Sequence, residues 1–149
     1  MGTISVTASA DAHATAETVW KIIADAEHWP DWSPNQRAAL DQTGDPAPNG
    51  VGAIRRFGTG RVEVREEVVT FEPPRKFEYR LLSGLPMRDY LATVLVDDAG
   101  DHVRITWSAT FRPKYFGTGW LFRATVQKLT TDYSAALARE AERVTARDA

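Results

Sequence analysis

The chain has 149 residues, of which 43% are hydrophobic and 26% are charged, and its formal net charge is −2. This length and this balance indicate one globular domain with a single core, and they exclude a fibrous or an intrinsically disordered chain. Because acidic and basic residues are interspersed, we expect no nucleic-acid partner and no general attraction to polyanions or anionic membrane surfaces.

Three absences narrow the class of protein further. The chain has no cysteine, which excludes disulfides, thiolate metal sites and a cysteine nucleophile. No apolar run approaches the roughly 18 residues that a membrane span needs, so we expect no membrane span. The N-terminal sequence lacks the basic region and apolar run of a signal peptide, so we expect a cytoplasmic protein.

The first predicted elements are a strand and a short helical pair. Residues 4–12 alternate small apolar with polar side chains, which is the two-residue period of a half-buried strand. Thr15 can cap a helix whose apolar side chains recur at spacings of three and four, so we predict a helix over residues 15–24. A second helical segment is expected to end near Trp29, because Pro30 disfavours helical geometry in the residue before it.

Further strands and one long helix complete the predicted order. The strands are expected at residues 36–42, 51–57, 61–71, 76–82, 89–97 and 102–112. Turn-forming residues separate them, which favours antiparallel pairing, and Gly58 and Gly60 are expected to close the strand at residues 51–57. After Pro113 the apolar period changes to three and four without interruption, which predicts one helix over residues 118–147.

This order predicts an α+β fold in a single domain of residues 1–149. A seven-stranded antiparallel sheet has one face that a long terminal helix can cover. Because a strongly curved sheet and one helix touch best at their ends, the space between their middles need not be filled by side chains. We therefore expect an internal cavity between the sheet and the C-terminal helix.

The segment ETVWKIIADAEHWPDWSP, residues 17–34, resembles the start of the polyketide cyclase/dehydrase type 2 branch of the SRPBCC or START-like superfamily. The residues in and just before this segment that match the family pattern are Ala14, Val19, Trp20, Asp25, Trp29, Pro30 and Trp32. Further on, the turn at residues 49–52, the Glu-Pro-Pro hairpin at residues 71–75 and the Thr106-Trp107 pair are similar to family motifs. The resemblance covers nearly the whole chain and implies the helix-grip fold, a curved seven-stranded sheet wrapped around a long C-terminal helix.

Two departures from the family pattern concern the N-terminal elements. Thr15 stands where the family usually has proline, and we expect this change to be harmless because threonine caps a helix well. Ala8, Ala10 and Ala12 stand where larger aliphatic residues are common, which would leave more room inside.

Catalytic and metal-binding motifs are not visible in the sequence. The three histidines, His13, His28 and His102, are far apart and fall at element edges, so we expect no metal site and no cofactor. The segment at residues 58–61 is glycine-rich but lacks the strand-to-helix context of a phosphate-binding loop, and we interpret it as a turn.

Candidate ligand-binding residues are aromatic, apolar or cationic side chains that strand parity or proximity to the cavity could place at its wall. They are Trp29, Trp32, Phe57, Val64, Tyr79, Tyr90, Trp107, Phe111, Trp120 and Arg123. Ordinary packing in the sheet core is the competing interpretation for these aromatic residues. The strand at residues 102–112 alternates without a defect, so its apolar face, with Trp107, is expected to turn toward the long helix.

The resemblance adds an arginine to this set. Aromatase/cyclase relatives orient a poly-ketone chain with an arginine and tyrosines in an otherwise apolar cavity. This implies Arg65 or Arg123 together with Tyr79 or Tyr90 here, and the sequence leaves the choice open.

Three functions are compatible with the sequence. The leading hypothesis is binding of a lipid-, isoprenoid- or polyketide-like hydrophobic small molecule, by a monomer or homodimer. The first alternative is a cofactor-free cyclase, aromatase or dehydratase that positions its substrate and transfers protons, which a buried ion-like pair in the cavity would favour. The second alternative is a regulatory or toxin-like protein-interaction module, which an exposed apolar patch would favour.

Overall fold

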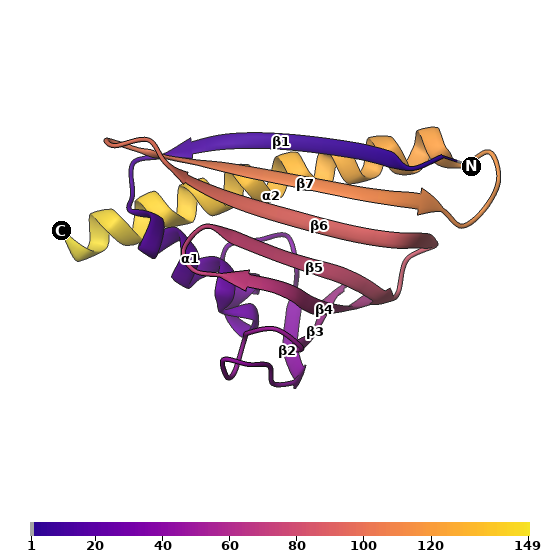
Figure 1. The fold of residues 1–149 in the computed structure, drawn as a ribbon, viewed down its shortest axis with the longest axis horizontal. Coiled ribbons are helices and arrows are strands. Elements are labelled where there is room, and N and C mark those ends of the chain that lie inside the picture. The colour runs from indigo at the N-terminus through magenta and orange to yellow at the C-terminus, as the bar shows by residue number, and fades with distance from the viewer. Residues whose placement is uncertain (1) are drawn as a thin grey trace.

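The computed structural model describes residues 2–149 and contains one seven-stranded antiparallel sheet with the strand order β1-β7-β6-β5-β4-β3-β2 (Figure 1). The strands are β1 (Ile4–Ala12), β2 (Arg37–Gln42), β3 (Ile54–Thr59), β4 (Val62–Glu72), β5 (Lys76–Ser83), β6 (Met87–Asp98) and β7 (Val103–Pro113). Each strand from β2 onward pairs with its neighbour in sequence, and β1 closes the sheet beside β7. The predicted α+β class and helix-grip architecture are confirmed.

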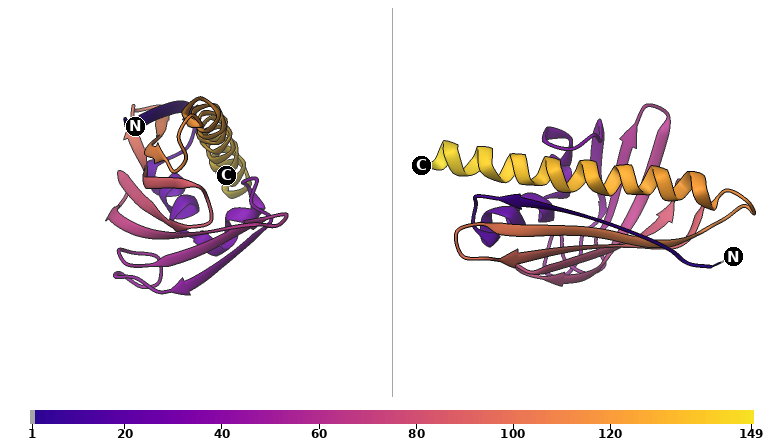
Figure 2. Two further views of the ribbon diagram at one scale, coloured as in Figure 1. Left: turned by 90° about the vertical axis from the view of Figure 1, so that its right-hand side faces the viewer. Right: turned by 90° about the horizontal axis from the view of Figure 1, so that it is seen from above.

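Three helices cover the concave face of this sheet. They are α1 (Ala16–Ala24), the 3₁₀ helix η1 (Ala26–Asp31) and α2 (Gly119–Asp148). The Thr15 hydroxyl accepts a hydrogen bond from the N–H of Thr18 and so caps α1 as predicted. With 30 residues, α2 is an unbroken helix that packs against β1, β7 and α1. Figure 2 shows the sheet curving away from α2 below β7, which separates its middle strands from the helix. No helix within residues 2–149 is long and apolar enough to cross a membrane.

Most predicted boundaries agree with the structure to within one or two residues, and the segments around Trp29 and Phe57 differ in ways that have a physical cause. The helical segment η1 continues through Pro30 to Asp31, because the indole of Trp29 is fully buried and donates to the carbonyl of Ile23 at 3.0 Å. The predicted strand at residues 51–57 starts later, at Ile54, since Gly52 adopts a positive φ of 90° in the preceding turn. That strand also continues through Gly58, where a β-carbon would collide with the guanidinium of Arg37.

The hydrophobic core lies between the sheet and the three helices. In β7 the predicted alternation is complete, with Val103, Ile105, Trp107, Ala109 and Phe111 all buried. The Trp107 side chain is stacked on Tyr133 of α2, with ring centroids 5.0 Å apart, and meets Trp29 edge to face at 5.9 Å. Trp107 therefore connects β7, η1 and α2 at the centre of the core.

We expect Trp107→Ala to lower the free energy of unfolding by about 3–5 kcal/mol, because it removes a completely buried indole from a close-packed site. The matched control is Trp120→Ala, since Trp120 is 74% exposed and its removal should change stability by no more than about 0.5 kcal/mol. Urea unfolding followed by circular dichroism measures both values. Equal effects of the two substitutions would contradict this description of the core.

Candidate functional site

A pocket of about 150 Å³ lies between the middle strands of the sheet and α2. Its wall consists of Asn35, Phe57, Thr59, Val62, Val64, Glu66, Tyr79, Leu81, Leu85, Tyr90, Leu129 and Tyr133. Most of this wall is apolar, and its polar atoms come from one carboxylate, three tyrosines, one amide and one threonine. A single carboxylate thus faces a mostly apolar space with a few neutral polar groups.

Arg55 lies behind this wall, completely buried. It pairs with Glu66 directly across the β3–β4 register, and its Nη2 atom donates to Oε1 of Glu66 at 2.8 Å. Two other guanidinium nitrogens, Nε and Nη1, have no hydrogen-bond partner among the described residues. The guanidinium instead lies over four aromatic rings, those of Trp29, Tyr79, Phe57 and Phe77, at 4.6–5.1 Å. Cation–π attraction therefore replaces the hydration that burial removes.

Glu66 is the charged partner that reaches the pocket. Its side chain is 12% exposed, and only one of its oxygens is bonded by Arg55, which leaves the other available to a ligand. Burial raises the pKa of Glu66 above its ordinary value of 4.5, although the Arg55 guanidinium acts in the opposite direction. A carboxylate of this kind is a stronger hydrogen-bond acceptor and a stronger base than one in water.

Three tyrosines share the pocket wall with Glu66. Burial raises the pKa of Tyr79, Tyr90 and Tyr133, and the negative charge of Glu66 raises all three further. Their phenols therefore remain neutral and can donate hydrogen bonds to a ligand. The amide nitrogen of Asn35 donates to the Tyr133 hydroxyl at 3.0 Å and so holds that group in place.

Four of the predicted residues line the pocket, namely Phe57, Val64, Tyr79 and Tyr90. Trp29, Trp107 and Phe111 lie in the core behind or beside it; Trp29 stacks on Phe57 at 4.8 Å, and Phe111 lies 6.0 Å from Tyr90 between ring centroids. Trp107 was expected at the wall, but its indole is enclosed between Trp29 and Tyr133.

Three other predicted residues lie away from the pocket. Trp32 is partly buried against Trp29 and contributes to a different surface depression near the end of α2. Trp120 and Arg123 are exposed on the first turns of α2. Arg65 points to the surface, where it binds Asp41 at 3.1 Å, so the arginine beside the tyrosines is Arg55 rather than Arg65 or Arg123.

Sequence reasoning missed Arg55, Glu66, Tyr133, Leu129 and Asn35. A signal for the first two was present, because each occupies the apolar parity of its strand. Arg55 stands between Ala53 and Phe57, and Glu66 stands two positions after Val64. Two opposite charges on the inward faces of neighbouring strands predict a buried pair.

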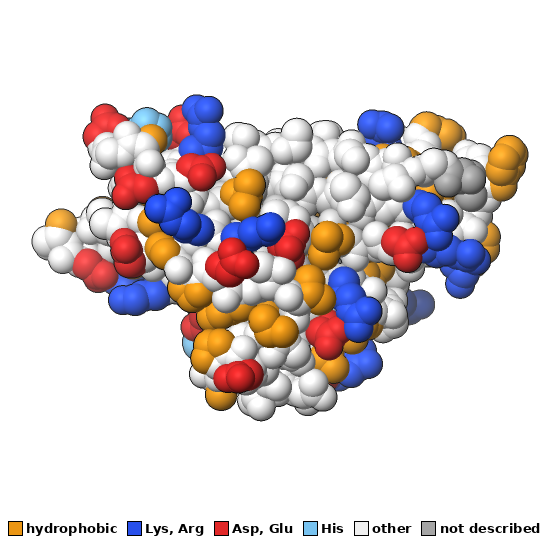
Figure 3. Space-filling model, viewed as in Figure 1, with side chains coloured by type: hydrophobic (Ala, Val, Ile, Leu, Met, Phe, Trp, Pro, Cys, Tyr) orange, Lys and Arg blue, Asp and Glu red, His pale blue; other side chains and the backbone are white. Residues whose placement is uncertain are grey.

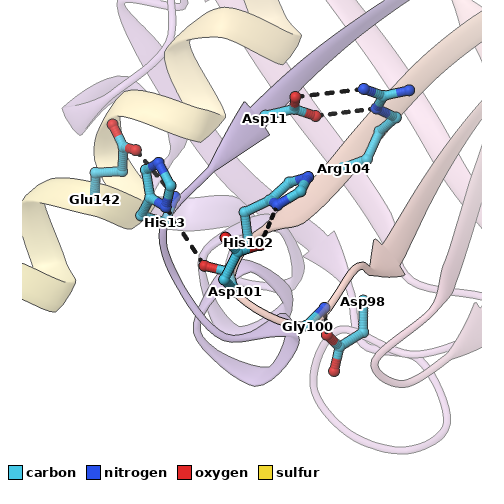
Figure 4. A network of polar contacts seen from close by, with 8 residues as sticks. All are labelled: Asp11, His13, Asp98, Gly100, Asp101, His102, Arg104 and Glu142. Atoms are coloured by element: carbon cyan, nitrogen blue, oxygen red, sulfur yellow. Dashed lines mark hydrogen bonds and ion pairs between the residues drawn. The ribbon is translucent and has the colours of Figure 1, made fainter.

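A second polar cluster lies far from the pocket, where the β1–α1 turn meets the β6–β7 turn and α2 (Figure 4). The backbone N–H of His13 donates to Glu142 at 2.9 Å, His102 contacts Asp101 at 2.7 Å, and Asp11 pairs with Arg104 at 3.0 Å. Arg104 holds the pKa of Asp11 below its ordinary value. These residues are mostly exposed, and within residues 2–149 no group of three or more His, Cys, Asp or Glu side chains could hold a metal ion. The cluster joins three segments of the chain.

Comparison with known proteins identifies similar sequences and folds. The sequence profile of the family described as "Polyketide cyclase / dehydrase and lipid transport" matches residues 3–145. A START superfamily protein from Mycobacterium smegmatis has a TM-score of 0.81 at 15% identity, over 94% of this chain and 98% of that one.

Two further solved structures are similar in fold. The Zhui aromatase/cyclase from Streptomyces sp. R1128 has a TM-score of 0.81 at 16% identity, over 95% of each chain. Norcoclaurine synthase from Thalictrum flavum, in complex with dopamine and hydroxybenzaldehyde, has a TM-score of 0.72 at 19% identity, over 98% of this chain and 88% of that one. No curated protein matches the sequence significantly. At these identities the structural matches establish the fold alone.

We expect Arg55→Met to lower the free energy of unfolding by about 3–5 kcal/mol at neutral pH, because it leaves the Glu66 carboxylate buried without its partner. The loss should shrink as the pH falls. Without Arg55 the folded-state pKa of Glu66 rises further, so the folded protein takes up a proton there before the unfolded chain does and gains stability.

Urea unfolding at a series of pH values measures this dependence. The control is Arg56→Met, which removes a partly exposed arginine from the same strand and should change stability by no more than about 1 kcal/mol. A deficit in the Arg55 variant that is independent of pH would contradict the buried pair.

Proposed function

The chain belongs to the polyketide cyclase / dehydrase and lipid transport family, within the START-like superfamily, and we propose that it binds a hydrophobic small molecule in the pocket beside Glu66. The observation that carries the proposal is a mostly apolar pocket with one carboxylate in its wall, held from behind by Arg55. Apolar walls with a few oriented polar groups are the common pattern of small-molecule sites.

The size of the pocket limits what it accepts. About 150 Å³ is comparable to cavities that enclose a single aromatic ring. A lipid-, isoprenoid- or polyketide-like molecule would therefore place one ring or one chain end beside Glu66, with the remainder outside. A donor group on that end would bind the free oxygen of Glu66, and an acceptor group would bind the hydroxyl of Tyr79 or Tyr90.

A second candidate function is catalysis by proton transfer, and the buried Arg55–Glu66 pair is the observation that favours it. A carboxylate whose pKa is raised by burial acts as a general base nearer neutral pH than one in water. The neutral tyrosines of the same wall would donate hydrogen bonds to an oxyanion that forms when a proton is removed beside a carbonyl.

The binding function is tested with 2-naphthol, a bicyclic probe with one hydroxyl donor. We expect saturable binding, measured by the change in naphthol fluorescence, and affinity lower by at least about tenfold for 2-methoxynaphthalene, which cannot donate to Glu66. Val64→Phe should abolish binding because it fills the pocket. Val69→Phe is the matched control, since Val69 lies on the same strand but is exposed. Equal affinities of the two variants would refute binding in this pocket.

Proton transfer is tested with 5-nitrobenzisoxazole, whose ring proton is abstracted by a base while the nitrogen–oxygen bond breaks, giving a coloured cyanophenolate. The protein should accelerate this reaction, and the rate should rise with pH to a plateau whose midpoint lies above 4.5, because the carboxylate form of Glu66 is the base. Glu66→Gln and Val64→Phe should each remove the acceleration, whereas Val69→Phe should retain it. Acceleration that survives Glu66→Gln would exclude Glu66 as the base.

A further inference from the structure

The end of the molecule where β7 leads into α2 exposes a group of large apolar side chains. Phe116 is 91% exposed and Trp120 is 74% exposed, and Tyr115 and Leu121 are exposed beside them. We call these four residues the aromatic tip. Single exposed apolar residues are common on globular proteins, whereas several large ones together mark an interaction surface.

The backbone holds the aromatic tip in this position. Gly117 has a positive φ of 81°, which turns the chain between the aromatic residues of the loop and the start of α2. The Thr118 hydroxyl donates to the carbonyl of Tyr115 at 2.7 Å, and the N–H of Lys114 donates to the carbonyl of Pro86 at 3.0 Å. The exposed rings thus belong to an ordered loop and a helix end.

The charges around the aromatic tip are nearly all positive. Residues 112–123, which contain the tip and its flanks, include three lysines and arginines and no aspartate or glutamate, in a chain whose net charge is −2. Arg88, Lys114 and Arg123 are exposed near the tip, and the nearby carboxylate of Asp89 pairs with Arg112 at 2.7 Å. Figure 3 shows hydrophobic and basic side chains together at this end of the molecule.

We propose that the aromatic tip binds the surface of a bilayer that contains anionic lipids. Tryptophan, tyrosine and phenylalanine partition favourably into the interface between headgroups and acyl chains. Lysine and arginine beside them are attracted to anionic headgroups. The absence of acidic residues over residues 112–123 favours a uniformly anionic partner over a protein surface, which would present charges of both signs.

The tip is linked to the pocket by one loop. Lys114 bonds to Pro86 of the β5–β6 loop, and the preceding residue, Leu85, forms part of the pocket wall. A protein bound through its tip would hold this part of the wall near the lipid surface. Binding of the tip to vesicles requires no ligand in the pocket, so it can be measured whether or not the pocket binds a small molecule.

The test is sedimentation of the protein with vesicles of phosphatidylcholine, with or without phosphatidylserine. Wild type should bind the phosphatidylserine vesicles, bind phosphatidylcholine alone much more weakly, and lose affinity as the salt concentration rises. The double variant F116S/W120S should bind at least about tenfold more weakly, whereas V69S/L95S, which alters two exposed apolar residues of the sheet, should bind like wild type.

The charge contribution is tested with Lys114→Gln and Arg123→Gln together. Removing these two cations should weaken binding by about 25-fold, since each contributes about a factor of five. The matched control is Lys21→Gln with Arg75→Gln, which removes two exposed cations at the opposite end of the molecule and should have little effect.

Brominated lipids, which quench tryptophan fluorescence on contact, show whether Trp120 itself enters the bilayer. They should quench the fluorescence of Trp120, and the quenching should disappear in Trp120→Phe while vesicle binding persists.

Val64→Phe should bind vesicles like wild type, even if it fails to bind naphthol. Absence of vesicle binding, equal binding to both lipid compositions, or a dimer in solution that only F116S/W120S dissociates would overturn the proposal.

Discussion

Burial of the Arg55 guanidinium is the constraint on which the site depends. A buried cation requires both an opposite charge and polarisable surroundings, and these come from β4, which supplies Glu66, and from aromatic rings of η1, β3 and β5. Satisfying one side chain therefore fixes how four elements meet. Because Phe57 and Tyr79 contact Arg55 and also line the pocket, the same contacts fix the pocket wall.

A contribution to folding stability does not by itself explain why Arg55 and Glu66 form a buried ion pair. Two well-packed apolar residues in place of a buried ion pair often leave a protein equally stable or make it more stable. The arrangement instead gives the pocket a carboxylate at a fixed position with one oxygen free. Since Arg55 offsets the charge of Glu66 and the tyrosines remain neutral, the pocket carries little net charge and remains compatible with an apolar ligand.

The sequence predicts the fold better than the site, for physical reasons. The alternation in β7 and the apolar stripe of α2 are local patterns, and both elements form where expected. The pairing of Arg55 with Glu66 depends on the β3–β4 register, and an arginine in isolation is most often a surface residue. Tyr133 reaches the pocket only because α2 crosses the sheet at that point, which residue spacing within the helix does not reveal.

The overall composition also describes the distribution of charge on the surface incompletely. Averaged over the chain, acidic and basic residues nearly cancel, which led us to expect no attraction to anionic surfaces. Attraction decays within about one Debye length, roughly 8 Å at physiological ionic strength, so a partner responds to the charges near its contact surface rather than to the total. The acid-free stretch of residues 112–123, from the end of β7 through the first turns of α2, provides such a local excess. Because this stretch also carries the aromatic tip, the lipid-facing end and the pocket wall at Leu85 belong to one connected part of the fold.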